Sequence, residues 1–182
     1  MKNAKNPGDP RIAISGKSGC GNTTVSRLVS ERLGLRFINF TFRNLAAEKG
    51  ISLEEALKQA AVDDSWDREV DRRQTSIARE DGGCVLGSRL AIWMLEEADL
   101  KVYLRAEPET RAKRIAGREG GAIESVAAFT AERDRQDRER YLRIYHIDND
   151  DYGFADLVVD TDSIDPPGIA DIIIAKLTEK LR

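Results

Sequence analysis

The stretch GKSGCGNTT, residues 16–24, follows a short run of β-type residues, RIAIS (11–15), and precedes a helical pattern. It matches the phosphate-binding pattern G-x-x-x-x-G-K-[ST] except at one position, where Asn22 replaces the lysine. In loops of this kind, backbone N–H groups curve around the phosphates, and the dipole of the following helix adds positive potential. Because neither contribution needs the lysine side chain, the stretch predicts a phosphate-binding loop between a strand and a helix.

Short apolar runs alternate with helical patterns along the rest of the chain. Strands are predicted at residues 11–15, 36–40, 84–87, 100–106 and 156–161. One helix is predicted after the loop, because the apolar residues Val25, Leu28, Val29 and Leu33 recur there at helical spacing. Further helices are predicted over residues 41–80 (interrupted at 50–52), 108–118, 124–145 and 166–181. Strands that alternate with helices form parallel sheets covered on both faces. We therefore expect an α/β protein with a three-layer P-loop fold and a five-stranded parallel sheet.

The chain length of 182 residues suits one domain with a sizeable core. We expect a disordered leader over residues 1–10 and a single domain over residues 11–182. Two helical blocks, at 41–81 and about 117–130, interrupt the strand pattern. We expect them to be insertions over the carboxyl ends of the strands, where ligands bind in parallel sheets.

The charge balance and the cysteine content indicate which partners and which cellular compartment to expect. The chain has 29 basic and 32 acidic residues and a net charge of −3. This near balance argues against nucleic acid or an anionic membrane surface as the partner. Cys20 and Cys84 are far apart in the sequence, which favours a reducing, cytosolic compartment. No run of residues approaches the roughly 18 apolar residues of a membrane span. We expect a cytoplasmic protein that works as a monomer.

The helix predicted over 124–145 carries charges on the face that should be buried. At 100° per residue, that face holds Val126, Phe129, Arg133, Asp137, Arg140 and Ile144. Inward charges need partners. The two arginines could fork onto phosphate oxygens, with Asp137 holding them or a sugar or base group. A solvated or internally salt-bridged helix is the alternative interpretation.

A second basic stripe lies on the helix predicted over 108–118. Arg111, Arg114 and Arg118 share one face, and the helix ends before a glycine pair at 120–121. A basic stripe before a glycine hinge is typical of a mobile lid over a nucleotide, although a solvated helix face has the same pattern.

Two residues of the loop could carry further chemistry. Thr23 takes the position whose hydroxyl group binds Mg²⁺ in phosphate-binding loops. Lys17 follows the first glycine, so it could supply the missing positive charge or could be an ordinary exposed loop residue.

Together these features resemble the cytidylate kinases, in particular the short archaeal-type branch of that family. The resemblance runs from about Arg11 to the C-terminus. It rests on IAISGKSGCGNTTVSRLVSERLG, FRNLAAEKGISLEE, DREVDRRQ, SRLAIWM, ADLKVYLRA, RAKRIAGREG and ERDRQDRERY. Members of this branch often carry a hydroxyl residue in place of the lysine, and Asn22 departs from both types. Ser88 stands where the family usually has glycine.

The resemblance implies a site with two halves and two insertions. Residues 41–81 would bind the nucleoside monophosphate, and residues 117–130 would form the lid. The expected ATP-binding residues are Gly16, Ser18, Gly19, Cys20, Gly21, Asn22, Thr23, Thr24, Arg114 and Arg118, with Thr23 on the metal. The expected CMP-binding residues are Arg43, Arg72, Arg89, Arg133, Asp137 and Arg140. The expected catalytic residues are Arg133, Asp137, Arg140 and Lys17.

The implied reaction transfers the γ-phosphoryl group of MgATP to CMP or dCMP and gives CDP or dCDP. The implied partners are ATP and a pyrimidine nucleoside monophosphate, with Mg²⁺ as cofactor. Two alternatives stay open on the sequence. One is another small-molecule P-loop kinase. The other is a nucleotide-binding protein that is weak or silent in catalysis, because Asn22 replaces the lysine.

Overall fold

The apolar runs form one parallel sheet. In the computed structural model, which describes residues 9–80 and 83–182, its strands are β1 (Arg11–Gly16), β2 (Arg36–Ile38), β3 (Cys84–Gly87), β4 (Leu100–Arg105) and β5 (Leu157–Asp160). Their spatial order is β2-β3-β1-β4-β5, and all neighbours are parallel. The predicted α/β fold with a five-stranded parallel sheet is therefore confirmed. Residues 1–8 of the predicted leader lie outside the described residues.

Eight helices connect and follow the strands in the described part of the chain. They are α1 (Asn22–Leu33), α2 (Phe42–Glu48), α3 (Leu53–Ala60), α4 (Ser65–Glu80), α5 (Ala91–Met94), α6 (Pro108–Glu119), α7 (Ile123–Tyr145) and α8 (Pro166–Lys180). The predicted block 41–80 divides into α2, α3 and α4. Ser52 caps α3 through the amide of Glu55, and the carboxylate of Asp63 accepts from the amide of Ser65 at the start of α4.

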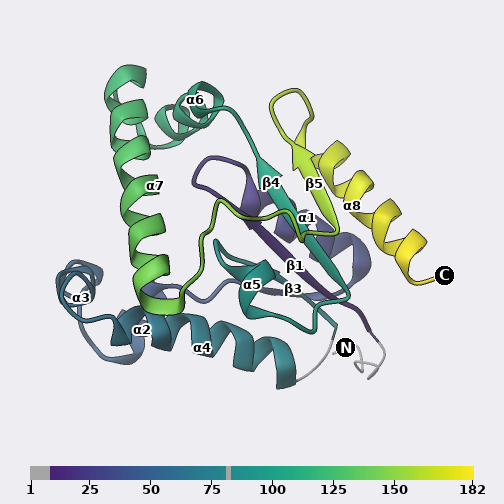
Figure 1. Cartoon of the computed structure of the whole chain (residues 1–182), viewed down its shortest axis with the longest axis horizontal. Helices are drawn as coiled ribbons and strands as arrows, with labels where there is room; N and C mark the ends of the chain where they lie inside the picture. Colours follow the sequence, from purple (N-terminus) through teal and green to yellow (C-terminus); the bar gives the residue numbers. More distant parts are fainter. Residues whose placement is uncertain (1–8, 81–82) are drawn as a thin grey trace.

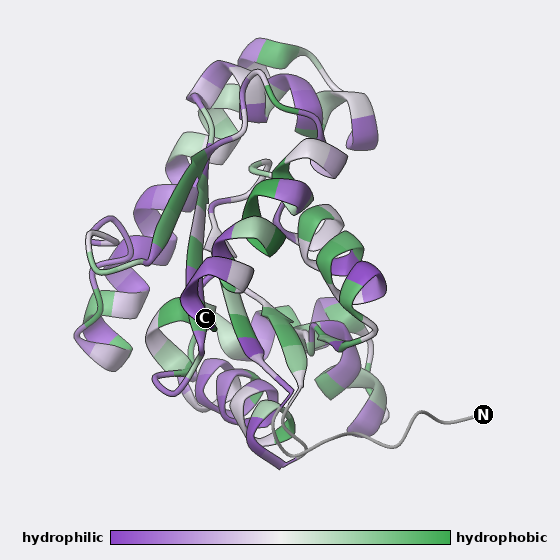
Figure 2. Cartoon of the chain, turned by 90° about the vertical axis from the view of Figure 1, so that its right-hand side faces the viewer, coloured by the Kyte–Doolittle hydropathy of each residue, from purple (hydrophilic) through white to green (hydrophobic). Residues whose placement is uncertain are grey.

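Each face of the sheet has its own apolar core. Alternate residues of a strand point to opposite faces, so Ile12 and Ile14 of β1 pack with α1 and α8, whereas Ala13 packs with α4 and α5. Figure 1 shows α1 and α8 together on one side of the sheet and α5 on the other. Figure 2 shows hydrophobic residues along the strands and hydrophilic ones on the outer turns of the helices. The three predicted layers are present.

A third apolar cluster holds α2, α3 and α4 together, away from the sheet. Its buried members are Leu45, Ala46, Ala56, Trp66 and Val70. Figure 1 shows the long helix α7 running from α6 down to this group. The guanidinium group of Arg68 donates to the carbonyl of Ile144 at 3.0 Å, so the last turn of α7 is fastened to α4. As a result, one face of α4 and one face of α7 lie opposite each other beside the carboxyl ends of the strands.

None of the helices within residues 9–80 and 83–182 is long and apolar enough to cross a membrane.

Candidate active site

The predicted loop leaves β1 at Gly16 and turns sharply into α1. Gly19 and Gly21 have φ angles of 86° and 89°, a left-handed conformation that favours glycine. Space is also limited, because a Cβ atom on Gly16 would lie 2.7 Å from the carbonyl oxygen of Leu104. A Cβ atom on Gly19 would lie 2.8 Å from the Cβ atom of Arg111. The glycines are therefore required by the backbone and by the close approach of β4 and α6.

The amide groups of this loop remain available. The amide of Cys20 donates to the carbonyl of Lys17 at 3.2 Å, which closes the turn. Within residues 9–80 and 83–182, the amides of Gly19 and of residues 21–24 have no hydrogen-bond acceptor. They stand at the N-terminus of a 12-residue helix, where the helix dipole adds positive potential. This geometry suits a phosphate group.

Asn22, at the position of the absent lysine, has a structural role. Its side-chain amide donates to the carbonyl of Ser88 at 3.1 Å, and its side-chain oxygen accepts from the hydroxyl of Ser26 at 3.0 Å. The first residue of α1 is thereby tied to the segment that follows β3. That segment carries Arg89, whose guanidinium group donates to the hydroxyl of Ser18 at 3.0 Å.

Two arginines of α6 hold the outer side of the loop. The buried Arg111 donates to the carbonyl of Ser18 at 3.1 Å and forms an ion pair of 2.5 Å with Asp134 of α7. Arg114 donates to the carbonyl of Gly19 at 3.3 Å. These contacts fix the loop against α6 and α7. Arg111 lay on the predicted basic stripe but not among the predicted ATP-binding residues.

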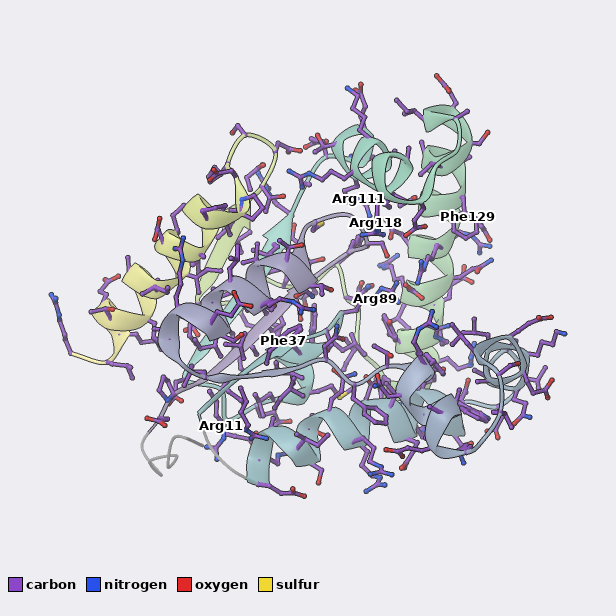
Figure 3. All side chains as sticks on the ribbon, turned by 180° about the vertical axis from the view of Figure 1, so that it is seen from behind. Arg11, Phe37, Arg89, Arg111, Arg118 and Phe129 are labelled. Atoms are coloured by element: carbon purple, nitrogen blue, oxygen red, sulfur yellow. The ribbon has the colours of Figure 1, made fainter. Side chains whose placement is uncertain are left out.

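The remaining arginine of the predicted basic stripe, Arg118, is exposed and pairs with Glu119. In Figure 3 Arg118 lies near Arg111, on the side of α6 that faces the loop. Lys17 forms an ion pair of 2.5 Å with Asp150, from the segment between α7 and β5. A cavity beside the loop is lined by Gly16, Lys17, Arg89, Tyr103, Asp134, Asp137 and Asn149.

A continuous chain of charges leads from the loop to α4. Arg89 lies 3.3 Å from the buried carboxylate of Asp137, and Arg140 lies 2.8 Å from the other oxygen of that carboxylate. Arg140 also lies 3.3 Å from Asp67 of α4, which is buried. The structure therefore brings together Arg89, Asp137 and Arg140, all predicted, and adds Asp67.

Burial and neighbouring charges shift the pKa values of this chain of charges. Burial alone would lower the pKa of Arg89, but Tyr141 and Asp137 raise it. Burial would likewise lower the pKa of Arg140, and Asp67 raises it. Burial raises the pKa of the Asp67 carboxyl group despite the charge of Arg140. Both arginines are thus held firmly in the charged form.

Two residues on the predicted inward face of α7, Phe129 and Arg133, are exposed in the structure. Phe129 was expected to be buried but is 67% exposed, because α7 extends beyond the sheet there and only one of its sides meets α6. Arg133 is also exposed. Partial desolvation of its guanidinium group and the like charge of Arg89 lower its pKa, so it faces the chain of charges from the solvent side.

Two predicted CMP-binding residues lie outside this group of contacts. Arg43 is exposed on α2. Arg72 is exposed on α4 and pairs with Glu69 of the same helix at 2.8 Å. Sequence reasoning missed Asp67 and Asp71, because the many i, i+3 and i+4 charge pairs of this helix are typical of a surface helix. The carboxyl group of Asp71 accepts from the hydroxyl of Tyr145 at 2.7 Å, and burial raises its pKa to about 6.

The chain is similar to proteins of known type in both sequence and structure. The sequence pattern of the cytidylate kinase-like family matches residues 11–163. A cytidylate kinase 2 of Borreliella afzelii is 46% identical over 167 residues, covering 90% of this chain and 93% of the relative. A cytidylate kinase of Pyrococcus horikoshii is 44% identical over 168 residues, covering 91% of this chain and 87% of the relative.

Solved structures show the same fold at lower identity. A shikimate kinase from Acinetobacter baumannii, in complex with shikimate, superposes with a TM-score of 0.65 at 17% identity, covering 96% of this chain and 97% of the other. A deoxyadenosine kinase from M. mycoides, with bound dATP, superposes with a TM-score of 0.56 at 18% identity, covering 92% of this chain and 99% of the other. The phosphate-binding loop, the sheet order and the sequence match agree. The chain belongs to the cytidylate kinase-like family.

Proposed function

We propose that the protein transfers the γ-phosphoryl group of MgATP to CMP, and to dCMP, giving CDP or dCDP and ADP. One observation carries this proposal. The side chain of Arg89 contacts Ser18 of the loop and Asp137 of α7, so a single cation joins the two halves of the site. Phosphoryl transfer needs the donor and acceptor anions to be brought close and the charge between them neutralised.

The donor half is the loop of residues 16–24. Its free amides and the start of α1 would hold the ATP phosphates, with Arg114 and Arg118 on the lid side. Thr23 is exposed in the first turn of α1, so its hydroxyl group fits a metal that arrives with the nucleotide. No set of three or more acidic, histidine or cysteine side chains in the described residues could hold a metal. Mg²⁺, once bound, supplies neutralisation of the phosphate charge.

The acceptor half is formed by Arg89, Arg133 and Arg140. Two of them share the carboxylate of Asp137, which sets their geometry before substrate arrives. Arg43 on α2 would reach the acceptor phosphate as the helices of residues 41–81 close over it. We include residues 117–130 as the lid. Arg72 would act only if its pair with Glu69 opened.

In this proposal, different residues take over the structural role and the positive charge of the absent lysine. Asn22 keeps α1 in register with the segment after β3, and the positive charge comes from Arg89 and from Lys17. Lys17 lines the same cavity as Arg89, and Asp150 holds it in place. We further propose that the enzyme acts as a cytoplasmic monomer on free nucleotides.

The test is turnover of a panel of acceptors by the purified protein with MgATP. CMP is expected to give the highest kcat/KM, with dCMP next and UMP and AMP lower. A faster reaction with AMP or with an acceptor that is not a nucleotide would identify a different small-molecule kinase. Binding of ATP without phosphorylation of any acceptor would identify a silent nucleotide-binding protein.

A further inference from the structure

The segment between α7 and β5 carries a buried polar side chain, Asn149, beside the phosphate-binding loop. Asn149 is 4% exposed, and in the part of the chain that the structure describes its Oδ1 atom accepts no hydrogen bond. Its backbone carbonyl, by contrast, accepts from the hydroxyl of Tyr103 at 3.4 Å. Buried acceptors normally have a donor, because burial without one lowers the stability of the fold. The Oδ1 atom therefore indicates that a donor reaches it in another state of the site.

Two cations line the same cavity as Asn149, and one of them has donors left. Figure 1 shows the segment between α7 and β5 crossing the sheet next to the loop after β1. Arg89 is fixed in that cavity, because it donates to Ser18 and pairs with Asp137. Lys17 is the other cation, and its side chain is 26% exposed. An ammonium group has three N–H donors, so Lys17 can serve a second acceptor besides its carboxylate partner.

Lys17 can reach Asn149 by movement of its side chain alone. In the structure its ammonium group forms an ion pair of 2.5 Å with Asp150, the residue that follows Asn149. Consecutive Cα atoms lie about 3.8 Å apart, and lysine has a flexible stem. The carboxylate of Asp150 is 43% exposed, whereas Asn149 is buried. Rotation about the bonds of the stem would therefore carry the ammonium group from an outer acceptor to an inner one.

Asp150 would keep a cation after Lys17 had left it. The guanidinium group of Arg138 lies 3.6 Å from the other carboxylate oxygen of Asp150. Arg138 is held there by Asp148 of the same segment, at 2.6 Å. The exchange thus leaves Asp150 beside a positive charge. A phosphoryl group that enters the cavity would supply the negative charge that draws Lys17 inward.

We propose that Asn149 is a positioning residue for Lys17. When the phosphoryl group enters, the ammonium group leaves Asp150 and is held between the Oδ1 atom of Asn149 and the oxygen atoms of the group being transferred. A neutral acceptor suits this role, because it orients the ammonium group without competing with the phosphoryl oxygens for its charge. The inference rests on the proposed function and adds the residue that places the positive charge of Lys17.

The experiment is a double-mutant cycle on kcat for CMP with MgATP. The variants are Lys17→Met, Asn149→Leu and the two combined. Asp151→Leu is the control, since Asp151 is exposed on the same segment. Asn149→Leu should lower kcat about 10-fold or more, equivalent to about 1.4 kcal/mol, and should leave KM for CMP nearly unchanged. In the Lys17→Met background the same change should have little further effect, because there is then no ammonium group to hold.

Two further measurements separate positioning of Lys17 from support of the fold. Asn149→Asp keeps an acceptor of the same shape, so its kcat should lie closer to the wild-type value than that of Asn149→Leu. Replacing an unpaired buried acceptor with an apolar group should not lower stability, so the Tm of Asn149→Leu should equal or exceed that of the wild type while kcat falls. If Asn149→Leu does not fold, Asn149→Ala takes its place in the cycle.

The outcomes distinguish this inference from the proposed function. Wild-type kcat in Lys17→Met or in folded Asn149→Leu overturns the positioning role and leaves the kinase assignment intact. An equal loss of kcat from Asn149→Leu with and without Lys17 does the same. A wild-type protein that phosphorylates no nucleoside monophosphate overturns both.

Discussion

The guanidinium group of Arg89 donates a hydrogen bond of 3.0 Å to the hydroxyl group of Ser18, which joins the segment after β3 to the phosphate-binding loop. The same guanidinium group lies 3.3 Å from the carboxylate of Asp137 on α7. In Figure 3 Arg89 stands between the loop and α7. Because one side chain contacts both the loop and α7, movement of either element would change the position of this positive charge.

Replacing Arg89 with alanine should therefore weaken both substrates. Each charge-assisted hydrogen bond is worth about 1.5–3 kcal/mol, so kcat/KM for CMP should fall roughly 10- to 150-fold, and KM for ATP should rise. Steady-state kinetics with each substrate varied in turn would measure this. Arg135→Ala is the control, since Arg135 lies on the exposed side of α7 and pairs with Glu132 and Glu139. An Arg89→Ala variant with only the KM for CMP altered would contradict the bridging role.

Arg140 and Arg133 should differ in their effect on stability. Arg140→Ala leaves the buried Asp67 without its cation, so the free energy of unfolding should fall by about 3–5 kcal/mol, together with CMP turnover. Arg133 is exposed and sits near the like charge of Arg89, so Arg133→Ala should lower CMP turnover at nearly unchanged stability. Urea denaturation and CMP kinetics on both variants provide the comparison. Equal losses of stability in the two variants would contradict the expected difference between Arg140, which pairs with a buried carboxylate, and the exposed Arg133.

Asp71 should make stability depend on pH. Burial raises its pKa from 3.8 to about 6, so the folded protein binds this proton more tightly than the unfolded chain does. The contribution of Asp71 to the free energy of unfolding must then decrease as pH rises from about 4 to about 6. Asp71→Asn lacks this titration and keeps an acceptor for Tyr145. Its advantage over wild type should grow across that window to on the order of 1–3 kcal/mol and then stay constant. A constant difference from pH 4 to pH 7 would refute the raised pKa.

Asn22 should contribute to stability as well as to the shape of the loop. Asn22→Ala removes the donor to the Ser88 carbonyl and the acceptor for Ser26, so the free energy of unfolding should fall by about 1–3 kcal/mol. Asn22→Asp keeps only the acceptor and places a charge beside the carbonyl of Ser88, so it should be destabilised to a similar degree. Thermal denaturation with and without ATP measures both variants. Wild-type stability in Asn22→Ala would mean that the two hydrogen bonds contribute nothing to the free energy of unfolding.

Most of the fold could be predicted because local pattern and tertiary structure agree. The apolar runs at 11–15 and 84–87 became β1 and β3, and the fold class, the family and the kinase class were confirmed. The short helix α5 (Ala91–Met94) was missed, since four residues are too few to show a helical period. The division into a leader, an insertion and a lid stays a prediction.

The site was predictable only where its residues share a helix or a loop. The spacing of Arg133, Asp137 and Arg140 within α7 was visible in the sequence, whereas the partner of Arg140 on α4, Asp67, comes from a distant segment that looked like a surface helix. Phe129 was misplaced because helical periodicity assigns a face but does not tell where along α7 the packing ends. The roles of individual site residues stay predictions.

The most direct measurement follows the phosphoryl group itself. ATP radiolabelled at its γ-phosphate is mixed with Mg²⁺, CMP and the purified protein, and the products are separated by anion-exchange chromatography. The label should appear in CDP, with one CDP formed for each ATP consumed. Label that stays in ATP, or that appears only in inorganic phosphate, would contradict the proposed transfer.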